Sequence, residues 1–310
     1  MKNNIINTFI KKFNSQYYKI LGITFLILPI LNLFAHVIPT DYSNFLFFVP
    51  FVCFTINDDR RTGIDVKSFL FLALPFLAFI MIIFINGNGI WQSVLSWEIG
   101  RNLFDLNDFF SKIPLNDGSF SRIFTAAWFT EYMKFVYNTG FVLAAIVPIV
   151  RSALAIDFKK MVRYTLSAHV FQVFLITPFY IAFFLQEVWF VKGHPDMLAR
   201  VLTPDQTLST VLNCFPSMHT SIAFAMFLLV LREKDNLFKW IWGIYCISVV
   251  YSTMYLEIHW VIDVIAGMIF GYAIVKLVDF VLKKSEAYFP KKLLARLHKE
   301  LDINLMGCND

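Results

Sequence analysis

Two short stretches of the sequence combine side chains that can exchange protons with side chains that can contact a phosphate. The first contains Ser217 and His219, and the second, forty positions later, contains His259 and Asp263. His259 and Asp263 are four residues apart, so on a helix they share one face. The carboxylate can then hold one imidazole nitrogen and leave the other free to react. This arrangement predicts a histidine nucleophile that attacks phosphorus.

The other histidine can supply the proton transfers that such a reaction needs. His219 can protonate the leaving oxygen and later activate the acceptor. The predicted reaction is therefore a two-step transfer through a phosphohistidine. We expect neither a metal ion nor another cofactor, because the sequence has no carboxylate cluster of the kind that binds hard cations.

Both stretches stand directly before apolar runs, and so at the expected starts of two helices. The N–H groups of a helix start have no helical partner and carry partial positive charge, which attracts phosphate. Pro216 fits the position before such a start, and the hydroxyl of Ser217 adds a donor. Thr220, in the first turn of the same helix, is a further candidate for phosphate binding.

The composition indicates which elements must position these residues. The chain has 310 residues, of which 58% are hydrophobic and 16% are charged. Soluble domains have about 45–50% apolar and about 25% charged residues, so we predict an integral membrane protein. No basic patch alternates with aromatic residues, so we expect no nucleic acid as a partner.

A transmembrane helix needs about 20 mostly apolar residues. On this basis we predict an all-α fold, a polytopic membrane helix bundle of about eight transmembrane helices with a six-helix catalytic core. The candidate spans are 18–38, 43–56, 66–85, 124–150, 164–185, 217–231, 238–254 and 260–282.

The placement of Lys and Arg predicts the orientation of this bundle. With the N-terminus inside, the inner segments hold twenty of these residues and the outer segments hold five. Cytoplasmic loops carry the excess of Lys and Arg, so we predict a multi-pass protein of the cytoplasmic membrane with both termini inside. Ser217 and Trp260 then lie at the outer, periplasmic face. In an internal membrane, the same residues would face a lumen.

The same map divides the chain into three parts. Residues 1–123 contain N-terminal membrane segments and, over 86–123, amphipathic helices that we expect along the outer interface. Residues 124–282 form the catalytic membrane core. Residues 283–310 form a basic cytoplasmic tail, which is either an interfacial helix or a solvated segment.

The two stretches resemble the motifs of the type 2 phosphatidic acid phosphatase superfamily. The chain reads Pro-Ser-Met-His at 216–219, where that superfamily has Pro-Ser-Gly-His. It reads His-x3-Asp at 259–263, where the superfamily has Ser-Arg-x5-His-x3-Asp. The resemblance covers about 164–282 and implies a membrane enzyme that acts on lipid phosphate esters.

The resemblance also implies a role for each matching residue. His259 would be the nucleophile, His219 the acid and base, and Asp263 the residue that orients the nucleophile. Ser217 would bind the phosphate. These roles agree with those that the residue types and their spacing predict.

The chain departs from the superfamily pattern in three places. Met218 replaces the Gly, Ser252 and Thr253 replace Ser-Arg, and the first motif, Lys-x6-Arg-Pro, has no clean match. Such departures are similar to those of the inositol phosphorylceramide synthase branch and its sphingomyelin synthase relatives. The upstream turn at 178–180, Pro-Phe-Tyr, is similar to that branch as well. Its members move a phosphorylated head group between lipids.

A phosphate site without the usual Arg needs another positive charge. Arg200 and Lys192 lie in the loop before the first stretch and are candidates, although such a loop is often only solvated. Elsewhere, Glu131 and Lys134 are spaced to neutralise one another. We expect Lys276 to pair with Asp279 in the same way, and Glu257 to face water.

The sequence therefore predicts an enzyme, and it leaves two reactions and one other class of protein open. Transfer of a phospho-head group between lipids is favoured over hydrolysis, because a dianionic terminal phosphate needs more cations than a phosphodiester does. A non-catalytic lipid-binding or transport protein with the same fold is the remaining alternative. The expected partners are a membrane lipid substrate (a phospholipid or lipid phosphate) and a lipid alcohol acceptor. The head group, the lipid tail and the oligomeric state are left open.

Overall fold

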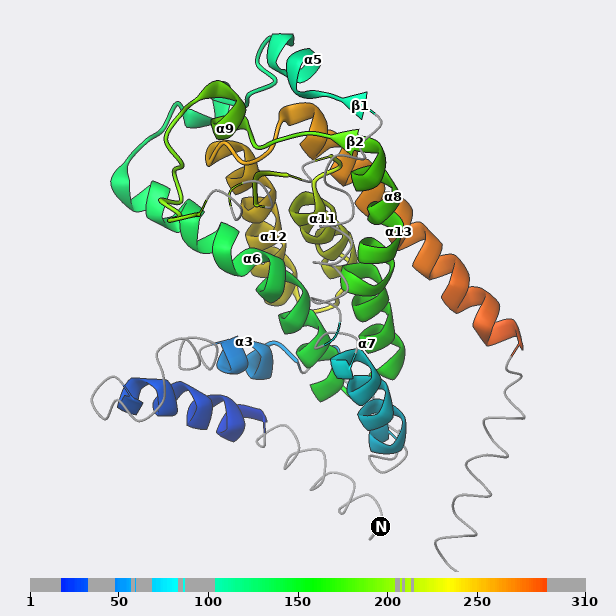
Figure 1. Ribbon diagram of the computed structural model, residues 1–310. Coiled ribbons are helices and arrows are strands. Elements are labelled where there is room, and N and C mark those ends of the chain that lie inside the picture. The colour runs from blue at the N-terminus through cyan, green and yellow to red at the C-terminus, as the bar shows by residue number, and fades with distance from the viewer. Residues whose placement is uncertain are drawn as a thin grey trace, which may run out of the picture.

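The computed structural model describes residues 18–32, 48–56, 59, 69–82, 86, 104–203, 207, 210–212 and 215–288. Over these ranges the chain is mostly helical, and its long helices pack side by side as a bundle (Figure 1). The prediction of an all-α membrane helix bundle is confirmed. The helices of this bundle are α6 (Ala127–Leu154), α7 (Phe158–Thr165), α8 (Phe171–Ala182), α11 (Met218–Val230), α12 (Asn236–Tyr255) and α13 (Val261–Tyr288).

Helix α11 occupies the centre of the bundle, between α6, α12 and α13. Its side chains are apolar on every side of the helix, and most of them are buried, including Ile222, Met226 and Leu229. A helix that is hydrophobic all round is one that its neighbours enclose. Enclosure of α11 therefore fixes the position of its first residues, which carry the first sequence motif.

The structure confirms the existence of most predicted apolar helices, but not the count of eight spans. Three helices are long and apolar enough to cross a membrane, namely Phe158–Ala182, Asn236–Tyr255 and Val261–Ser285. The two halves of α6, Ala127–Gly140 and Val142–Leu154, meet at 58° and make a fourth span if they are counted together. Any membrane crossing in addition to these stays a prediction.

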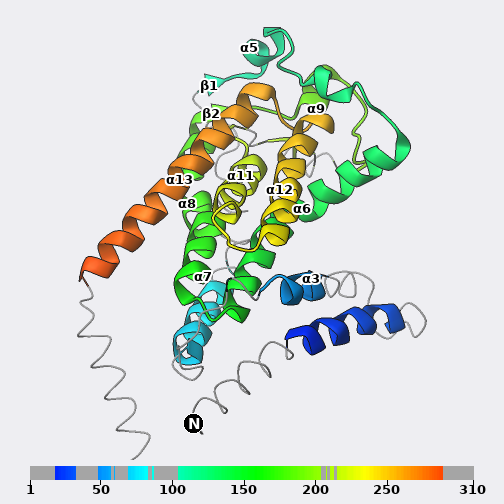
Figure 2. The same ribbon diagram turned by 180° about the vertical axis from the view of Figure 1, so that it is seen from behind.

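The apolar segments at the N-terminal side form shorter helices. Tyr18–Asn32 and Phe69–Ile82 fall within the predicted spans 18–38 and 66–85. Helix α3 (Phe48–Phe54) lies in the predicted span 43–56. Tyr18–Asn32 and α3 run across the lower end of the bundle rather than alongside α11 and α12 (Figures 1 and 2).

A buried ionic network closes this end of the bundle, which we call the Arg151 end. The Arg151 guanidinium donates to Asp59 at 2.6 Å and to Glu233 at 3.0 Å, and all three side chains are almost fully buried. Lys160 bridges the same two carboxylates at 3.1 and 2.6 Å. Tyr164 donates to Glu233 at 2.7 Å. Each charge in this network has at least two partners, as a buried charge requires.

Two chain segments far apart in the sequence gather at the opposite end of the bundle, and we call them the clamp. The first, 104–122, contains β1 (Phe104–Asp105), α5 (Asn107–Lys112) and the 3-10 turn η2 (Ser119–Arg122). The second, 183–200, contains β2 (Phe183–Phe184) and α9 (Val188–Lys192). The two strands pair in parallel, Phe104 opposite Phe183. Figures 1 and 2 show the clamp above the starts of α11 and α13.

The clamp gives residues 104–122 contacts that the sequence does not predict. These residues fold onto the turn between α12 and α13, where the Tyr251 hydroxyl and the Val261 N–H both donate to their backbone carbonyls. Their place along the outer interface stays a prediction. The expected amphipathic helices over 87–103 lie outside the described residues. So does the tail 289–310, while α13 continues to Tyr288 and crosses the predicted boundary at 283.

Of the two ion pairs expected within single helices, one forms and the other does not. Lys134 and Glu131 do pair, at 2.9 Å. The expected pair of Lys276 with Asp279 is wrong. Asp279 instead binds Arg232 of the loop after α11 at 2.8 Å and Arg163 of α7 at 3.1 Å, because these helices converge on it at the Arg151 end.

Candidate active site

The first sequence motif forms the start of α11. Ser217 is the N-cap residue, and its hydroxyl accepts a hydrogen bond from the Thr220 N–H at 3.3 Å and donates to the Thr220 hydroxyl at 3.0 Å. Both side chains are fully buried. The backbone N–H groups of Met218 and His219 belong to the first turn, where an α-helix offers no carbonyl partner. This helix start can therefore donate to an anion.

The second motif forms the start of α13. His259 precedes the helix, Asp263 lies in its first turn, and the Nδ1 atom of His259 is 2.6 Å from Oδ2 of Asp263. The His259 side chain is 5% exposed and the Asp263 side chain is fully buried. The carboxylate therefore occupies Nδ1, and Nε2 is the atom of this imidazole that is left for chemistry.

The two motifs meet at the same end of the bundle, as the sequence predicts. The ring centroids of His219 and His259 are 6.1 Å apart, and the Ser217 N–H donates to the Asp263 carbonyl at 3.4 Å. The two imidazoles are therefore close neighbours at this end of the bundle. His219 is half-buried and stacks on the ring of Tyr137 from α6 at 4.8 Å, which orients its imidazole.

Two glycines of α13 allow this meeting. A Cβ atom at Gly267 would lie 2.6 Å from the Ser217 carbonyl oxygen, and one at Gly271 would lie 2.5 Å from that of Ser221. Small residues four apart are the usual means of bringing two membrane helices into backbone contact. These positions lie outside the two motifs and were not predicted, although the Gly-x3-Gly pattern in an apolar helix is a readable signal.

Two of the N–H donors at the start of α13 are already occupied. Asn116 of the clamp accepts the Val261 N–H with its backbone carbonyl at 2.8 Å and the Ile262 N–H with its side-chain oxygen at 2.9 Å. Asn116 is 2% exposed. Asn116 therefore uses two of the donors that were expected to attract phosphate at α13, and phosphate binding at either helix start stays a prediction.

Trp260, the residue directly after the candidate nucleophile His259, is anchored within the clamp. Its fully buried ring packs in a small cluster with Phe110, Leu185 and Val188. Its indole N–H donates to the Gln186 carbonyl at 2.9 Å. A large aromatic ring with a satisfied donor is a strong anchor, so both clamp segments hold the position of His259.

Glu257 does not face water, which corrects the prediction made for it. Its side chain is 7% exposed, and its carboxylate binds Arg122 at 2.9 Å and His194 at 2.8 Å. It stands at the reversal between α12 and α13, with φ of +57°. The sequence gives no periodic signal for such a position, because the turn points the side chain inward against the clamp.

Thr253 occupies the place where the superfamily pattern has an Arg. It is fully buried, and its hydroxyl donates to the Val250 carbonyl at 2.7 Å within α12. Its own carbonyl accepts the N–H groups of Ile258 and His259, both at 3.0 Å. Position 253 thus supports the backbone of the turn and supplies no cation.

Arg200 is the candidate cation that the structure brings towards the histidines. It lies close enough to His219 for their charges to interact. Its guanidinium binds Glu187 at 2.5 Å and Asp196 at 2.7 Å, and the Trp189 ring lies beside it. Burial alone would lower the pKa of Arg200, but the hydrogen bonds to these two carboxylates raise it above its ordinary value. The guanidinium is a fixed positive charge.

Lys192 has a different environment. Its ammonium group is 3.5 Å from the Ser111 carbonyl on the exposed surface of the clamp. Although burial acts to raise the pKa of Asp117, hydrogen bonds from Ser119 and the charges of Lys192 and Arg122 lower it. The contacts of Lys192 therefore lie within the clamp and include neither His219 nor His259.

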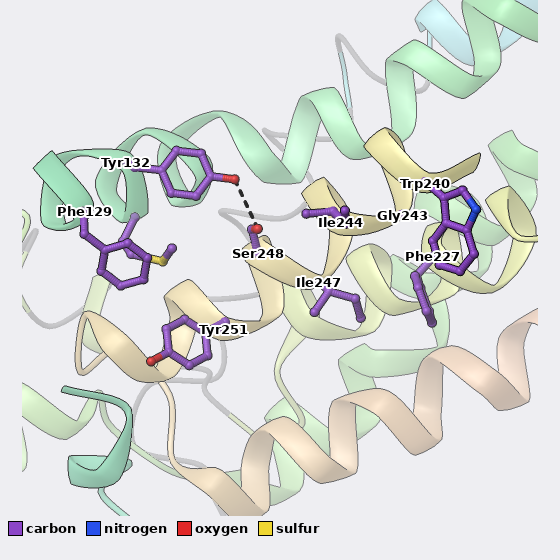
Figure 3. A pocket seen from close by; sticks show the side chains of 10 residues that line it. Phe129, Tyr132, Phe227, Trp240, Gly243, Ile244, Ile247, Ser248 and Tyr251 are labelled. Carbon is purple, nitrogen blue, oxygen red and sulfur yellow. Dashed lines mark hydrogen bonds between the residues drawn. The ribbon is translucent and has the colours of Figure 1, made fainter. Parts of the chain in front are cut away.

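An apolar groove lies elsewhere on the bundle, and it is not the phosphate site. It has a volume of about 360 Å³ and follows the exposed face of α12 between Trp240 and Tyr251, next to α6 (Figure 3). Its polar contact is a hydrogen bond of 3.1 Å between the hydroxyls of Tyr132 and Ser248. Neither histidine of the motifs lines the groove, and it contains no charged side chain.

Within the described ranges, no group of three or more His, Cys, Asp or Glu side chains is arranged to hold a metal ion. The carboxylate of Glu257 binds Arg122 and His194, that of Glu187 binds Arg200, and that of Asp263 binds His259. The arrangement of His219, His259 and Asp263 has instead the parts needed for nucleophilic and acid–base chemistry.

Comparison with known proteins places the same part of the chain in a family context. Residues 172–285 match the family model of the PAP2 superfamily, whose members are phosphatases or phosphotransferases. This segment contains both motifs and supports the resemblance at the level of the superfamily. With the apolar helices, it supports a multi-pass integral membrane protein.

A curated protein and the solved structures add little to this match. The chain is 34% identical over 89 residues to an uncharacterized protein of Methanocaldococcus jannaschii. The matched part is 28% of this chain, and it spans about a third of that protein's length (31%). No solved structure matches the chain.

Proposed function

We propose that this protein is an integral membrane enzyme that transfers a phosphorylated head group between lipids through a phosphohistidine on His259. The observation that carries the proposal is the contact of 2.6 Å between His259 and Asp263, with His219 facing the same imidazole at 6.1 Å. A carboxylate that binds one imidazole nitrogen fixes the tautomer and orients the other nitrogen for attack.

The first step forms the phosphoenzyme. The phosphate binds at the start of α11, where the first-turn N–H groups and Ser217, with Thr220 behind it, lie. Nε2 of His259 attacks phosphorus while the bond to the leaving oxygen breaks, and Asp263 stabilises the positive charge that develops on the ring. Protonated His219 gives its proton to the leaving oxygen. The products are a phosphohistidine, a released alcohol and a neutral His219.

The second step reverses these roles. Neutral His219 takes the proton of the acceptor hydroxyl, whose oxygen attacks phosphorus and breaks the bond to Nε2 of His259. The histidine pair returns to its starting state. A lipid or polyol alcohol as acceptor gives transfer, and water gives hydrolysis, so both reactions share one phosphoenzyme.

The charges around the site favour a phosphodiester donor, and hence transfer. Thr253 stands where the superfamily has its Arg, and Arg200 is shared between Glu187 and Asp196. A dianionic terminal phosphate gains more from free cations than a singly charged phosphodiester does. Hydrolysis of a lipid phosphate is the second candidate, since the superfamily includes phosphatases.

We place this chemistry at the outer face of a cytoplasmic membrane. Basic residues gather at the Arg151 end, which includes Lys159, Lys160, Arg163 and Arg232. Cytoplasmic ends of membrane helices carry such an excess, so the opposite end, with both motifs, would face outward. The substrate would then be a lipid of the outer leaflet.

One assay separates the candidate functions. The purified protein in mixed micelles receives a phospholipid labelled in its head-group phosphate, with and without ceramide or diacylglycerol as acceptor, and the products are resolved. A labelled new lipid that requires the acceptor supports transfer. Free phosphate released from a labelled phosphatidic acid without any acceptor would make the protein a phosphatase and refute the transferase.

His259→Ala is tested alongside the parent protein, because it removes the proposed nucleophile. We expect it to give neither product and no acid-labile phosphoenzyme. If His259→Ala matches the parent, the catalytic assignment is wrong. If the parent gives no product with either donor and no phosphoenzyme, the non-catalytic lipid-binding reading is favoured.

A further inference from the structure

We propose that Glu257 is a positioning residue for His259, and that it holds the turn between α12 and α13 by binding Arg122 and His194. The inference rests on the proposed role of His259 as the nucleophile. Glu257 lies two residues before His259 and does not itself contact the reacting atoms in this arrangement. Its effect would pass through the backbone of the turn.

The turn has an unfavourable backbone conformation at its centre. Glu257 has a φ of +57°, in the left-handed region that a residue with a Cβ atom rarely adopts. Its N–H donates to the Met254 carbonyl at 3.1 Å, and the N–H groups of Ile258 and His259 both donate to the Thr253 carbonyl at 3.0 Å. A conformation of this kind persists only where the surroundings hold it.

The carboxylate of Glu257 joins both segments of the clamp to this turn. Arg122, from the first segment, binds one carboxylate oxygen at 2.9 Å. His194, from the second segment, binds the other at 2.8 Å. The Glu257 carbonyl also accepts the Trp189 N–H at 3.0 Å, again from the second segment. Glu257 is therefore held from two sides by residues far from it in the sequence.

Arg122 extends this hold to the end of α12. Its guanidinium donates to the Met254 carbonyl at 3.3 Å and to the Asp117 carbonyl at 3.4 Å. The same cation thus contacts the last turn of α12 and the side chain of Glu257. Loss of the carboxylate would leave Arg122 buried without its acid and release the turn. Because displacement of a reacting group by about 1 Å can cost about 100-fold in rate, His259 would lose efficiency.

Two variants separate the carboxylate from the backbone conformation. Glu257→Gly removes the side chain but favours φ of +57°, because glycine has no Cβ atom. Glu257→Gln keeps the shape and one oxygen acceptor, but not the charge. The matched control is Glu131→Gln, which makes the same change in the exposed pair with Lys134, where the Glu131 side chain is 70% exposed.

The first measurement is steady-state turnover with the labelled phospholipid as donor and ceramide or diacylglycerol as acceptor. For Glu257→Gly we expect kcat to fall by about 10- to 100-fold with KM within about twofold, since the reacting geometry changes and the phosphate contacts do not. Glu257→Gln should recover part of this loss. Glu131→Gln should match the parent. A merely structural role would lower the fraction of folded protein and leave kcat per folded molecule unchanged, which would overturn the proposal.

The second measurement does not depend on activity. Diethyl pyrocarbonate modification of His259 is followed by mass spectrometry, because the His259 side chain is only 5% exposed and should react slowly in the parent. We expect its modification rate to rise several-fold in Glu257→Gly and to stay at the parental value in Glu131→Gln. An unchanged rate in Glu257→Gly would overturn the positioning role, whatever happens to kcat.

The two measurements together distinguish failure of this inference from failure of the proposed function. If the parent has no phosphoenzyme but His259 becomes more reactive in Glu257→Gly, the proposed reaction is wrong and Glu257 still positions His259. If the parent is active and neither kcat nor the reactivity of His259 changes, the reaction stands and the role of Glu257 is refuted.

Discussion

Gly267 lies against the backbone carbonyl of Ser217, so closely that a Cβ atom at position 267 would come within 2.6 Å of that oxygen. Ser217 begins α11 and Gly267 lies one turn beyond Asp263 in α13. This contact therefore sets how near the proposed phosphate-binding helix start comes to the proposed nucleophile. No side chain larger than hydrogen fits without moving one helix away from the other.

Substitution of this glycine should separate the two motifs. For Gly267→Ala we expect a loss of turnover of at least about tenfold, together with destabilisation of about 1–3 kcal/mol from overpacking. Thermal unfolding in micelles and the transfer assay measure the two effects. Gly243→Ala is the matched control, because a Cβ atom there would meet Phe227 at an ordinary 3.7 Å. Normal activity of Gly267→Ala would contradict the role of this contact.

The role proposed for His219 predicts a dependence on the leaving group. Without its acid, an alkoxide must leave unprotonated, whereas a nitrophenolate leaves readily without help. We expect His219→Gln to slow phosphoenzyme formation from an alkyl phosphodiester by about 10²–10⁴-fold. A nitrophenyl ester should lose much less. Rapid-quench measurement of phosphoenzyme compares the two, and equal losses for both substrates would argue against an acid at this position.

Arg200 is the candidate to supply the positive charge that the superfamily's Arg, replaced here by Thr253, would bring to the phosphate. If its charge reaches the bound phosphate, Arg200→Ala should weaken inhibition by vanadate by about tenfold, which corresponds to about 1.4 kcal/mol. Lys112→Ala serves as the control, since Lys112 lies on the clamp in an exposed pair with Asp108. Unchanged vanadate inhibition in Arg200→Ala would show that the charge of Arg200 does not reach the phosphate and serves only its contacts with Glu187 and Asp196.

The ionic network at the Arg151 end predicts how acid affects stability. Burial would raise the pKa of Asp59, but the hydrogen bond from Arg151 and those from the Lys234 and Asp235 N–H groups lower it well below its usual range. A carboxyl with a lowered pKa in the folded state stabilises the fold above its unfolded pKa, and this contribution disappears as the pH falls. We therefore expect thermal stability to decline below about pH 4.

Asp59→Asn should remove that part of the acid dependence and lower stability at neutral pH by about 1.5–3 kcal/mol, because Arg151 loses one charged partner and keeps Glu233. Unfolding temperatures measured from pH 7 to pH 3 in a non-ionic detergent test both effects. Asp108→Asn is the control, because the Asp108 side chain is 82% exposed. The same acid profile in Asp59→Asn as in the parent would show that other groups control acid unfolding.

The helices were predictable because each apolar run is long and ends at polar residues. The spans predicted over 217–231 and 238–254 correspond to α11 and α12 within two residues at each end. The 58° bend of α6 follows Gly140, a residue type that permits kinks, but the continuous hydropathy of 124–150 led to the prediction of one uninterrupted span. In the described part of the run 43–56, helix α3 ends at Phe54, because apolar composition alone does not fix where a helix stops.

The side chains proposed to react were predictable and their supports were not. The spacing of His259 and Asp263 implies a contact whenever the segment is helical, so the pair could be named before its geometry was known. Asn116 and Glu257 act through contacts that join distant parts of the chain, and such contacts leave no periodic trace in the sequence. Their long-range partners had to come from the fold.

The cap that Asn116 places on α13 has a consequence for how this protein is made. Asn116 is 146 positions ahead of Ile262, so the ribosome has already released it when the helix that it caps is still unsynthesised. A fragment cut from residue 172 onward would contain His259 and Asp263 but neither Asn116 nor Arg122. Helix α13, next to the proposed nucleophile, is therefore synthesised after the segment that caps it. The start of α13 thus depends on contacts that the upstream residues Asn116 and Arg122 supply.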